Sequence, residues 1–343
     1  MLNVVIMGGS LLMYVYALLT TGKLRIPVQT IVVLFFVGVT YLFTYMFFSQ
    51  NVKYIQPTIL RTLVVCFFTF LLVSKLSTFE YLCKYFVKGS FLITLSGVLY
   101  AEIISVIGHS TTSDWSTYSM TMSNVLLLSV LWQLNAYFGS KDKLALIAAI
   151  IGSVIIFIYG SRNPFLAIGF FVSMKILFNS KRKSSSGVAI KLFFVSFVGG
   201  MLDFFGLGSR TLYYLINADT VDITTGRDEI HDELWDIVLN DPFLGLGVAG
   251  DEVAIQELAH SMYLSIFVTY GMILGSLVIL YLFSQTIKGI CRTSGLNHDI
   301  IIMYVCLVFP RSFTGGDIWA NDSLWFLMAL IISSLRQRKE AMV

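Results

Sequence analysis

Long apolar stretches run along most of the chain, and short polar segments interrupt them. Each stretch is close to the roughly 20 residues that an α-helix needs to cross a hydrocarbon core about 30 Å thick. The pattern predicts an all-α polytopic membrane protein of about eleven spanning helices. The expected spans lie near residues 3–20, 27–48, 57–75, 90–108, 121–139, 143–160, 163–179, 188–208, 260–285, 299–314 and 322–335. The first stretch has neither a basic leader nor a small-residue cleavage site, so we expect a retained helix.

Composition supports a membrane protein. Of the 343 residues, 57% are hydrophobic and 13% are charged, whereas soluble domains carry about 25% charged residues. The mean hydropathy is +0.81. The formal net charge of +3 follows from the basic residues that flank membrane spans, and it does not indicate nucleic-acid binding.

The distribution of basic residues orients the chain. With the N-terminus outside and the C-terminus inside, 17 of the 23 lysines and arginines fall on the cytoplasmic side, as the positive-inside rule requires. We therefore expect a single integral membrane domain, residues 1–343, in the cytoplasmic (inner) membrane. A basic linker, KRKSSSG at 181–187, would join its halves on the cytoplasmic side.

The one large polar segment, residues 209–259, is expected outside. It carries eleven acidic and two basic residues. Within it, TTGRDEIHDELWDIVLNDP predicts an amphipathic helix, in which Thr225 and Asp228 fit a capping arrangement and Pro242 marks the end. Its apolar stripe can lie on the outer leaflet or fold back over the spans as a lid. The stripe consists of Ile230, Leu234, Ile237 and Val238. The glycine-rich FLGLGVAG that follows should bend easily.

Arginine dominates the basic residues outside. The positive-inside rule requires basic residues only on the cytoplasmic side, so it does not explain why arginine rather than lysine stands outside. The planar guanidinium binds phosphate through two hydrogen bonds at once, which a lysine cannot do. We expect anion ligands among these residues, although helix-end anchoring by Arg61 or Arg162 and pairing of Arg210 or Arg227 with nearby carboxylates are alternatives. The six are Lys53, Arg61, Arg162, Arg210, Arg227 and Arg311.

A histidine opens the apolar run AHSMYLSIFVTYG, residues 259–271. Glu257 stands three residues before His260, which on a helix would let its carboxylate orient the imidazole ring. A neutral imidazole is a suitable general base near neutral pH, and a polar residue at a helix start is the alternative. His231 and Arg227 lie four residues apart, on one helical face.

No motif supports a metal or a nucleotide. The sequence contains no CxxC, no HExxH and no glycine-rich phosphate loop. No two of the four cysteines lie in an extracytoplasmic loop, so we expect no structural disulfide.

The order GSRNP, GRDEIHDELWDIVLNDPFLGLG and AHSMYLSIFVTYGMILG resembles the O-antigen polymerase and ligase (Wzy and WaaL) superfamily, mainly over residues 155–285. The resemblance implies a type C membrane glycosyltransferase without cofactor, acting on a glycan carried by undecaprenyl pyrophosphate. Arg162 and Arg227 match arginines that hold the pyrophosphate, with Arg210 and Arg311 added as candidates. His260 matches the histidine that deprotonates the acceptor hydroxyl. Membrane lipid, a flippase and a chain-length regulator are the expected partners, and nucleic acid is not.

The motifs do not separate the two activities. His260, Ser261 and Gly271 satisfy the ligase histidine motif, but Leu274 stands where its next small residue is expected, and Gly275 follows one place late. Val238 stands where some polymerases have a glycine, eleven residues after Arg227. The short chain and divergent flanking spans favour a polymerase of O-antigen or capsular polysaccharide. A ligase acting on the lipid A core remains the alternative.

Two other classes stay open. A transporter or flippase would place charged or broken-helix sites near the bilayer midplane, whereas here the polar residues gather at the outer face. A non-catalytic assembly partner would not require His260 and the arginines together.

Overall fold

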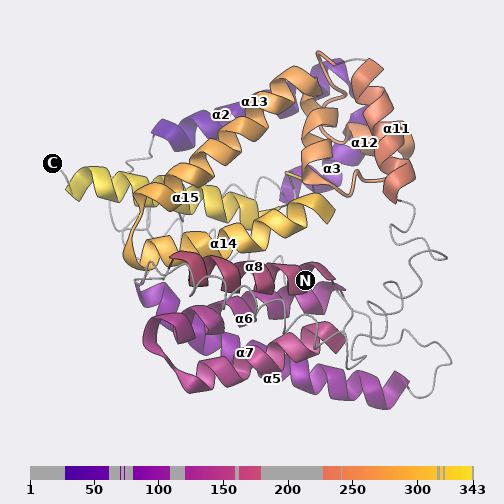
Figure 1. Ribbon diagram of the computed structural model, residues 1–343. Helices are drawn as coiled ribbons and strands as arrows, with labels where there is room; N and C mark the ends of the chain where they lie inside the picture. The colour runs from indigo at the N-terminus through magenta and orange to yellow at the C-terminus, as the bar shows by residue number, and fades with distance from the viewer. Residues whose placement is uncertain are drawn as a thin grey trace. The chain divides into compact units, whose positions relative to one another are not determined.

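The structure is a computed structural model that describes residues 28–61, 70, 73, 80–108, 120–158, 162–178, 227–240, 242–314, 317–319 and 321–341. All regular structure within these residues is helical (Figure 1). The helices are α2 (Val28–Phe47), α3 (Val52–Arg61), α5 (Glu80–Gly108), α6 (Met120–Ser140), α7 (Lys143–Ile158), α8 (Arg162–Phe178), α11 (Arg227–Asn240), α12 (Gly250–Ile255), α13 (Met262–Arg292), α14 (Gly295–Thr314) and α15 (Asp322–Ala341), with the 3-10 helix η1 (Ser49–Asn51) between α2 and α3.

These helices agree with most of the predicted spans. Eight of the spans coincide with α2, α5, α6, α7, α8, α13, α14 and α15. Two described helices, α2 and α13, are long and apolar enough to cross a membrane by themselves. The spans near 3–20 and 188–208, most of 57–75 and the linker 181–187 lie outside the described residues. The all-helical class is confirmed, and the count of eleven stays a prediction.

The chain forms two compact units. One comprises Phe79–Thr225 and Val305–Pro310, and its described helices are α5 to α8. Glycines let these helices approach closely, since a Cβ on Gly97 or Gly152 would lie 2.6 Å from a side-chain atom of Leu126 or Val130 in α6. Buried hydroxyls also join α5 to α6, and the Thr94 and Ser129 oxygens are 2.9 Å apart.

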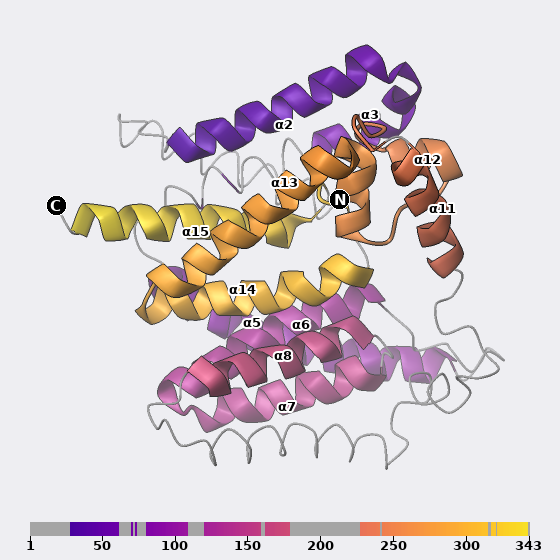
Figure 2. The same cartoon turned by 45° about the horizontal axis from the view of Figure 1, so that its top comes forward.

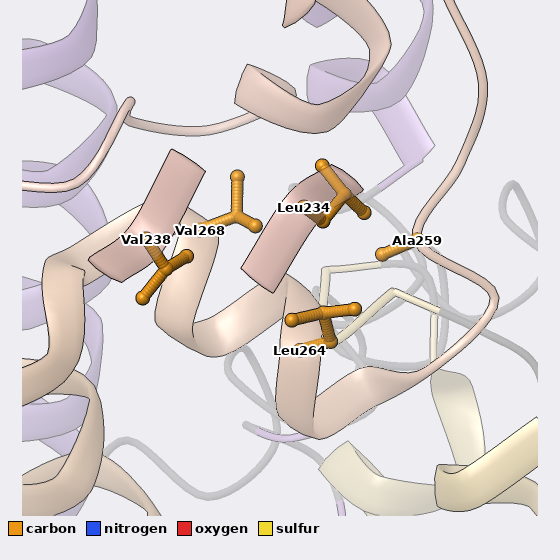
Figure 3. Close-up of a cluster of buried hydrophobic side chains, with 5 residues drawn as sticks. All are labelled: Leu234, Val238, Ala259, Leu264 and Val268. Atoms are coloured by element: carbon orange, nitrogen blue, oxygen red, sulfur yellow. The ribbon is translucent and has the colours of Figure 1, made fainter. Parts of the chain in front are cut away.

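The other unit comprises Met1–Thr78, Gly226–Tyr304 and Arg311–Val343. The apolar stripe of α11 packs against the beginning of α13, so the predicted amphipathic helix exists and folds back over a predicted span. Leu234 and Val238 of α11 are buried against Ala259, Leu264 and Val268. Figure 3 shows these five side chains gathered between α11, α13 and the segment before α13. Figure 2 shows α11 and α12 beside the first part of α13.

Helix α13 is broken at Gly271. This residue has φ 73° and ψ 173°, a conformation that a residue with a Cβ rarely adopts. The main chain of Pro242 and Phe243 lies so close that a Cβ on Gly271 would be 2.8 Å from the Phe243 carbonyl carbon. The Met272 N–H, freed by the break, donates to the Pro242 carbonyl at 2.7 Å.

The segment after α11 satisfies the other backbone groups at this break. The Leu246 N–H donates to the Val268 carbonyl at 2.7 Å, and the Gly247 N–H donates to the Thr269 carbonyl at 3.1 Å. The FLGLGVAG segment is therefore fixed to the broken helix by main-chain hydrogen bonds, and our expectation of an easily bent hinge is wrong. Its glycines permit close backbone approach instead.

Thr44 in the last turn of α2 and Asn51 in η1 bind the same segment. Asn51 donates through its amide to the carbonyls of Leu246, at 2.8 Å, and Val248, at 2.9 Å. The Val248 N–H donates to the Thr44 hydroxyl at 3.1 Å. Because every one of these bonds involves the backbone of residues 246–248, the path of this loop is tightly specified.

Candidate functional site

His260 lies in the connection between α12 and α13, where residues 256–261 are not helical. The residue is half-buried, and its φ of 49° is in the left-handed region. Such a conformation costs a non-glycine residue of order 1 kcal/mol or more, and it persists only where neighbouring bonds impose it. Strain of this kind often accompanies functional sites, so the bonds around His260 are of interest.

Both backbone groups of the preceding residue, Ala259, are bonded. Its N–H donates to the Asp251 carboxylate at 2.8 Å. Its carbonyl oxygen lies 3.0 Å from Nε2 of His231 on α11, and because a carbonyl only accepts, this nitrogen carries the proton. Ala259 itself is buried. The first bond holds the Leu258–Ala259 peptide and the second holds the Ala259–His260 peptide, so both peptides that precede the histidine side chain are restrained.

Asp251 is the carboxylate beside His260. It is 5% exposed, and burial raises its pKa above the ordinary value, while the Ala259 N–H and the charge of His260 act in the opposite direction. The influence of His260 is the smallest of these, and it favours the ionised carboxylate. A carboxylate in this position stabilises the protonated imidazole, as a general base requires.

A second carboxylate, Asp317, lies in the connection between α14 and α15. It accepts hydrogen bonds from the Ser265 hydroxyl at 3.0 Å and the Trp319 N–H at 3.2 Å. The residue as a whole is half-buried but its carboxyl group is enclosed. Burial, with the negative charges of Asp251 and Glu252, raises its pKa to about 7. Asp317 is thereby held against the first half of α13, close enough to Asp251 and Glu252 of α12 for their charges to act on it.

An apolar cavity of about 290 Å³ is lined in part by Ile318 and Trp319, the two residues that follow Asp317. Its walls come from α2, α13 and α15, and Tyr270 and Trp319 line it. The rings of these two residues are 6.3 Å apart, and the Tyr270 hydroxyl lies 3.2 Å from that of Thr40. The cavity is therefore almost wholly apolar, and the Tyr270 hydroxyl at its wall is paired with Thr40.

The unit that contains His260 also contains three of the predicted arginines, of which Arg61 is the last residue of α3. Arg227 is the first residue of α11, and Arg311 is in the last turn of α14 and half-buried. Arg162, the first residue of α8, belongs to the other unit. Arg210 and Thr225 lie outside the described residues.

The premise that Glu257 and His260 share a helix is wrong, whereas the role of Glu257 stays a prediction. Helix α12 ends at Ile255, so the three-residue spacing does not place the two side chains on one helical face. Glu257 is exposed. Asp251, nine residues before His260, is the carboxylate whose pKa His260 affects.

Sequence reasoning missed the roles of Asp251 and Asp317. Asp251 was one of eleven acids in the outer segment, and nothing in its spacing distinguishes it. Asp317 had a usable signal, because it is the only acidic residue between two expected spans, in TGGDIW. Among the described residues, no group of three or more His, Cys, Asp or Glu is arranged to hold a metal ion.

These features define a helical, membrane-associated protein with a polar site where a long broken helix begins. Residues 147–279 match the Wzy_C family model, described as O-antigen ligase. The match confirms the resemblance to the O-antigen polymerase and ligase superfamily, and it includes Arg162, Arg210, Arg227, Glu257 and His260. It does not distinguish polymerase from ligase. No curated protein matches the chain.

Proposed function

We propose that this chain is a glycosyltransferase that polymerises oligosaccharide repeat units linked to undecaprenyl pyrophosphate, for an O-antigen or a capsular polysaccharide. The observation that carries the proposal is His260, held in a left-handed conformation beside Asp251, within the segment that matches the family. The reaction would take place at the outer face of the cytoplasmic membrane, with the N-terminus outside and the C-terminus inside.

His260 acts as the general base. Its imidazole takes the proton of an acceptor sugar hydroxyl, and the oxygen forms a bond to the anomeric carbon of the donor glycan. The bond from that carbon to the lipid pyrophosphate breaks, and its electron pair leaves with the pyrophosphate. Asp251 stabilises the imidazolium that forms, which supports this role for the histidine.

Arginines hold the leaving pyrophosphate. Arg162 and Arg227 each stand at the first residue of a helix, α8 and α11, where backbone N–H groups and the helix dipole also favour anions. Fixed positive charge stabilises the negative charge that grows on the pyrophosphate in the transition state. Arg210 and Arg311 are further candidates for the same task.

The apolar cavity supports a lipid-linked substrate. It adjoins Asp317 and is lined almost entirely by apolar side chains, so it suits part of a hydrocarbon chain rather than a sugar. A lipid pyrophosphate is already activated, so no nucleotide is needed outside the cell. A flippase that supplies the lipid-linked repeat and a chain-length regulator are the proposed partners.

The test replaces the native copy with His260→Ala or Arg162→Ala, and with His298→Ala in α14 as a control. Surface glycan is resolved on a gel, and the amount of each variant in the membrane is measured. We expect single repeats in place of the ladder for the first two variants and a normal ladder for the control. An unchanged ladder in both site variants, at normal protein levels, would contradict catalysis and favour a transporter or an assembly partner.

The second candidate is an O-antigen ligase that transfers the glycan to the lipid A core, which the description of the matched family favours. The same variants distinguish a polymerase from a ligase. A polymerase defect leaves single repeats on the carrier or core, whereas a ligase defect leaves long chains on the carrier lipid and none on the core.

A further inference from the structure

Helix α13 is much longer than a membrane is thick. Its 31 residues extend about 46 Å at 1.5 Å per residue, against a hydrocarbon core of about 30 Å. The break at Gly271 divides it into Met262–Tyr270, about 14 Å long, and Met272–Arg292, about 31 Å long. The second part alone is long enough to cross the core.

Helix α2 gives a second, independent measure of where the hydrocarbon core ends. Its 20 residues, Val28–Phe47, extend about 30 Å, and it is the other described helix that is apolar and long enough to span. Its last turn binds the loop after α11, because the Thr44 hydroxyl accepts from the Val248 N–H at 3.1 Å. Two spans of membrane length therefore end at one loop.

The basic residues that flank α2 and α13 lie at the ends of these two spans that are remote from the loop. Lys288 and Arg292 stand at the far end of α13, and Lys23 and Arg25 precede α2 in the sequence. Basic residues mark the cytoplasmic ends of spans. The loop is thus at the opposite boundary of the hydrocarbon core.

The tip of the loop presents apolar side chains outward. Phe243 is 67% exposed and Leu244 63% exposed, although their main chain is fixed against Gly271. Just beyond the break, Ile273 and Leu277 on α13 are exposed by 55% and 58%, and a spanning helix presents such residues to lipid. The loop tip continues this apolar surface, whereas α11 exposes acidic side chains such as that of Asp236.

We propose that residues 242–244 form an interfacial anchor, with Phe243 and Leu244 inserted into the outer-leaflet lipid, and that the hydrocarbon boundary crosses α13 at Gly271. The half-helix Met262–Tyr270, together with α11 and α12, then stands outside the hydrocarbon core. His260 is accordingly in the aqueous layer, where polar molecules can reach it. The inference concerns membrane depth and does not depend on the proposed reaction.

The experiment measures depth with nitroxide spin labels on single cysteines. The four native cysteines are first replaced, and the full chain is reconstituted in phosphatidylethanolamine–phosphatidylglycerol vesicles. Phe243→Cys and Leu244→Cys are the test sites, Ile273→Cys and Leu277→Cys are the lipid references, and Asp236→Cys is the water reference. Collision with oxygen, which dissolves in lipid, is compared with collision with a water-soluble nickel chelate.

We expect the oxygen-to-nickel ratio at both test sites to be several-fold above that at Asp236 and to approach the lipid references. A water-like ratio at both test sites would overturn the proposal. Low collision with both reagents, with an immobilised label, would also overturn it, since protein rather than lipid would then cover the loop. Two test sites guard against a substitution that disturbs folding.

Discussion

The N–H of Ala259 donates to the carboxylate of Asp251 at 2.8 Å, which restrains the backbone one residue before His260. The same carboxylate lies near enough to His260 for the two to interact electrostatically. Asp251 therefore has two effects: it holds the backbone on which the histidine stands, and it favours the protonated imidazole.

Exchanging this carboxylate for an amide separates the two effects. Asp251→Asn keeps an oxygen that can accept from Ala259 but removes the negative charge beside His260. We expect glycan transfer to fall by about tenfold or more, as is reasonable for a residue that assists a general base. Glu257→Gln is the control, because Glu257 is exposed and off the helix. Transfer assayed in membranes should show little change for it, and the reverse order would restore Glu257 as the partner of His260.

The raised pKa of Asp317, about 7, predicts a pH-dependent stability. The folded state binds this proton more tightly than the unfolded state, so the free energy of unfolding should fall as the pH rises from about 4 to about 7. Asp317→Asn keeps the acceptor for Ser265 and Trp319 without a charge. Its Tm should exceed that of the wild type by a few degrees at pH 8 and lose this advantage at pH 5.

Thermal unfolding in detergent at both pH values measures this effect. Asp232→Asn, an exposed acid on α11, controls for general charge effects and should shift Tm equally at both. A Tm difference for Asp317→Asn that does not depend on pH would mean that this carboxyl does not change its protonation state in the folded protein between the two pH values.

Because α13 is broken at Gly271, we expect alanine at this position to destabilise the protein. Gly271→Ala forces a Cβ to within 2.8 Å of the Phe243 main chain and keeps φ at 73°, so we expect a loss of about 2 kcal/mol or more. Gly38→Ala in α2 meets no atom within 4 Å and should be neutral or slightly stabilising. Unfolding midpoints of the two variants give the comparison, and equal midpoints would mean that the loop moves away readily.

Because we propose that the arginines bind phosphate at two points, we expect that positive charge alone does not support glycan transfer. Arg227→Lys keeps the charge but loses two-point contact with an anion, so we expect transfer to fall by about tenfold, nearly as far as in Arg227→Ala. The assay compares transfer by membranes with matched amounts of each variant. Full activity in the lysine variant would indicate a general electrostatic role or pairing with the acidic residues of the outer segment.

The sequence by itself determined the helical class, most helix positions and the amphipathic α11. These follow from local patterns, since a span is read from the length of an apolar run and an amphipathic helix from spacing along one segment. The residues of the family resemblance, from GSRNP to His260, were also readable because they form short blocks in a fixed order.

Tertiary structure alone decided which carboxylate stands near His260, which residue Asp317 meets and why Gly271 is a glycine. Asp317 meets Ser265 across 52 residues of sequence, and the backbone that crowds Gly271 comes from Pro242 and Phe243. Such contacts depend on the paths of the connecting loops and on how the helices pack. A carboxylate close in sequence, Glu257, was therefore a poorer guide than Asp251, which the non-helical connection and its hydrogen bond to Ala259 bring back to the histidine.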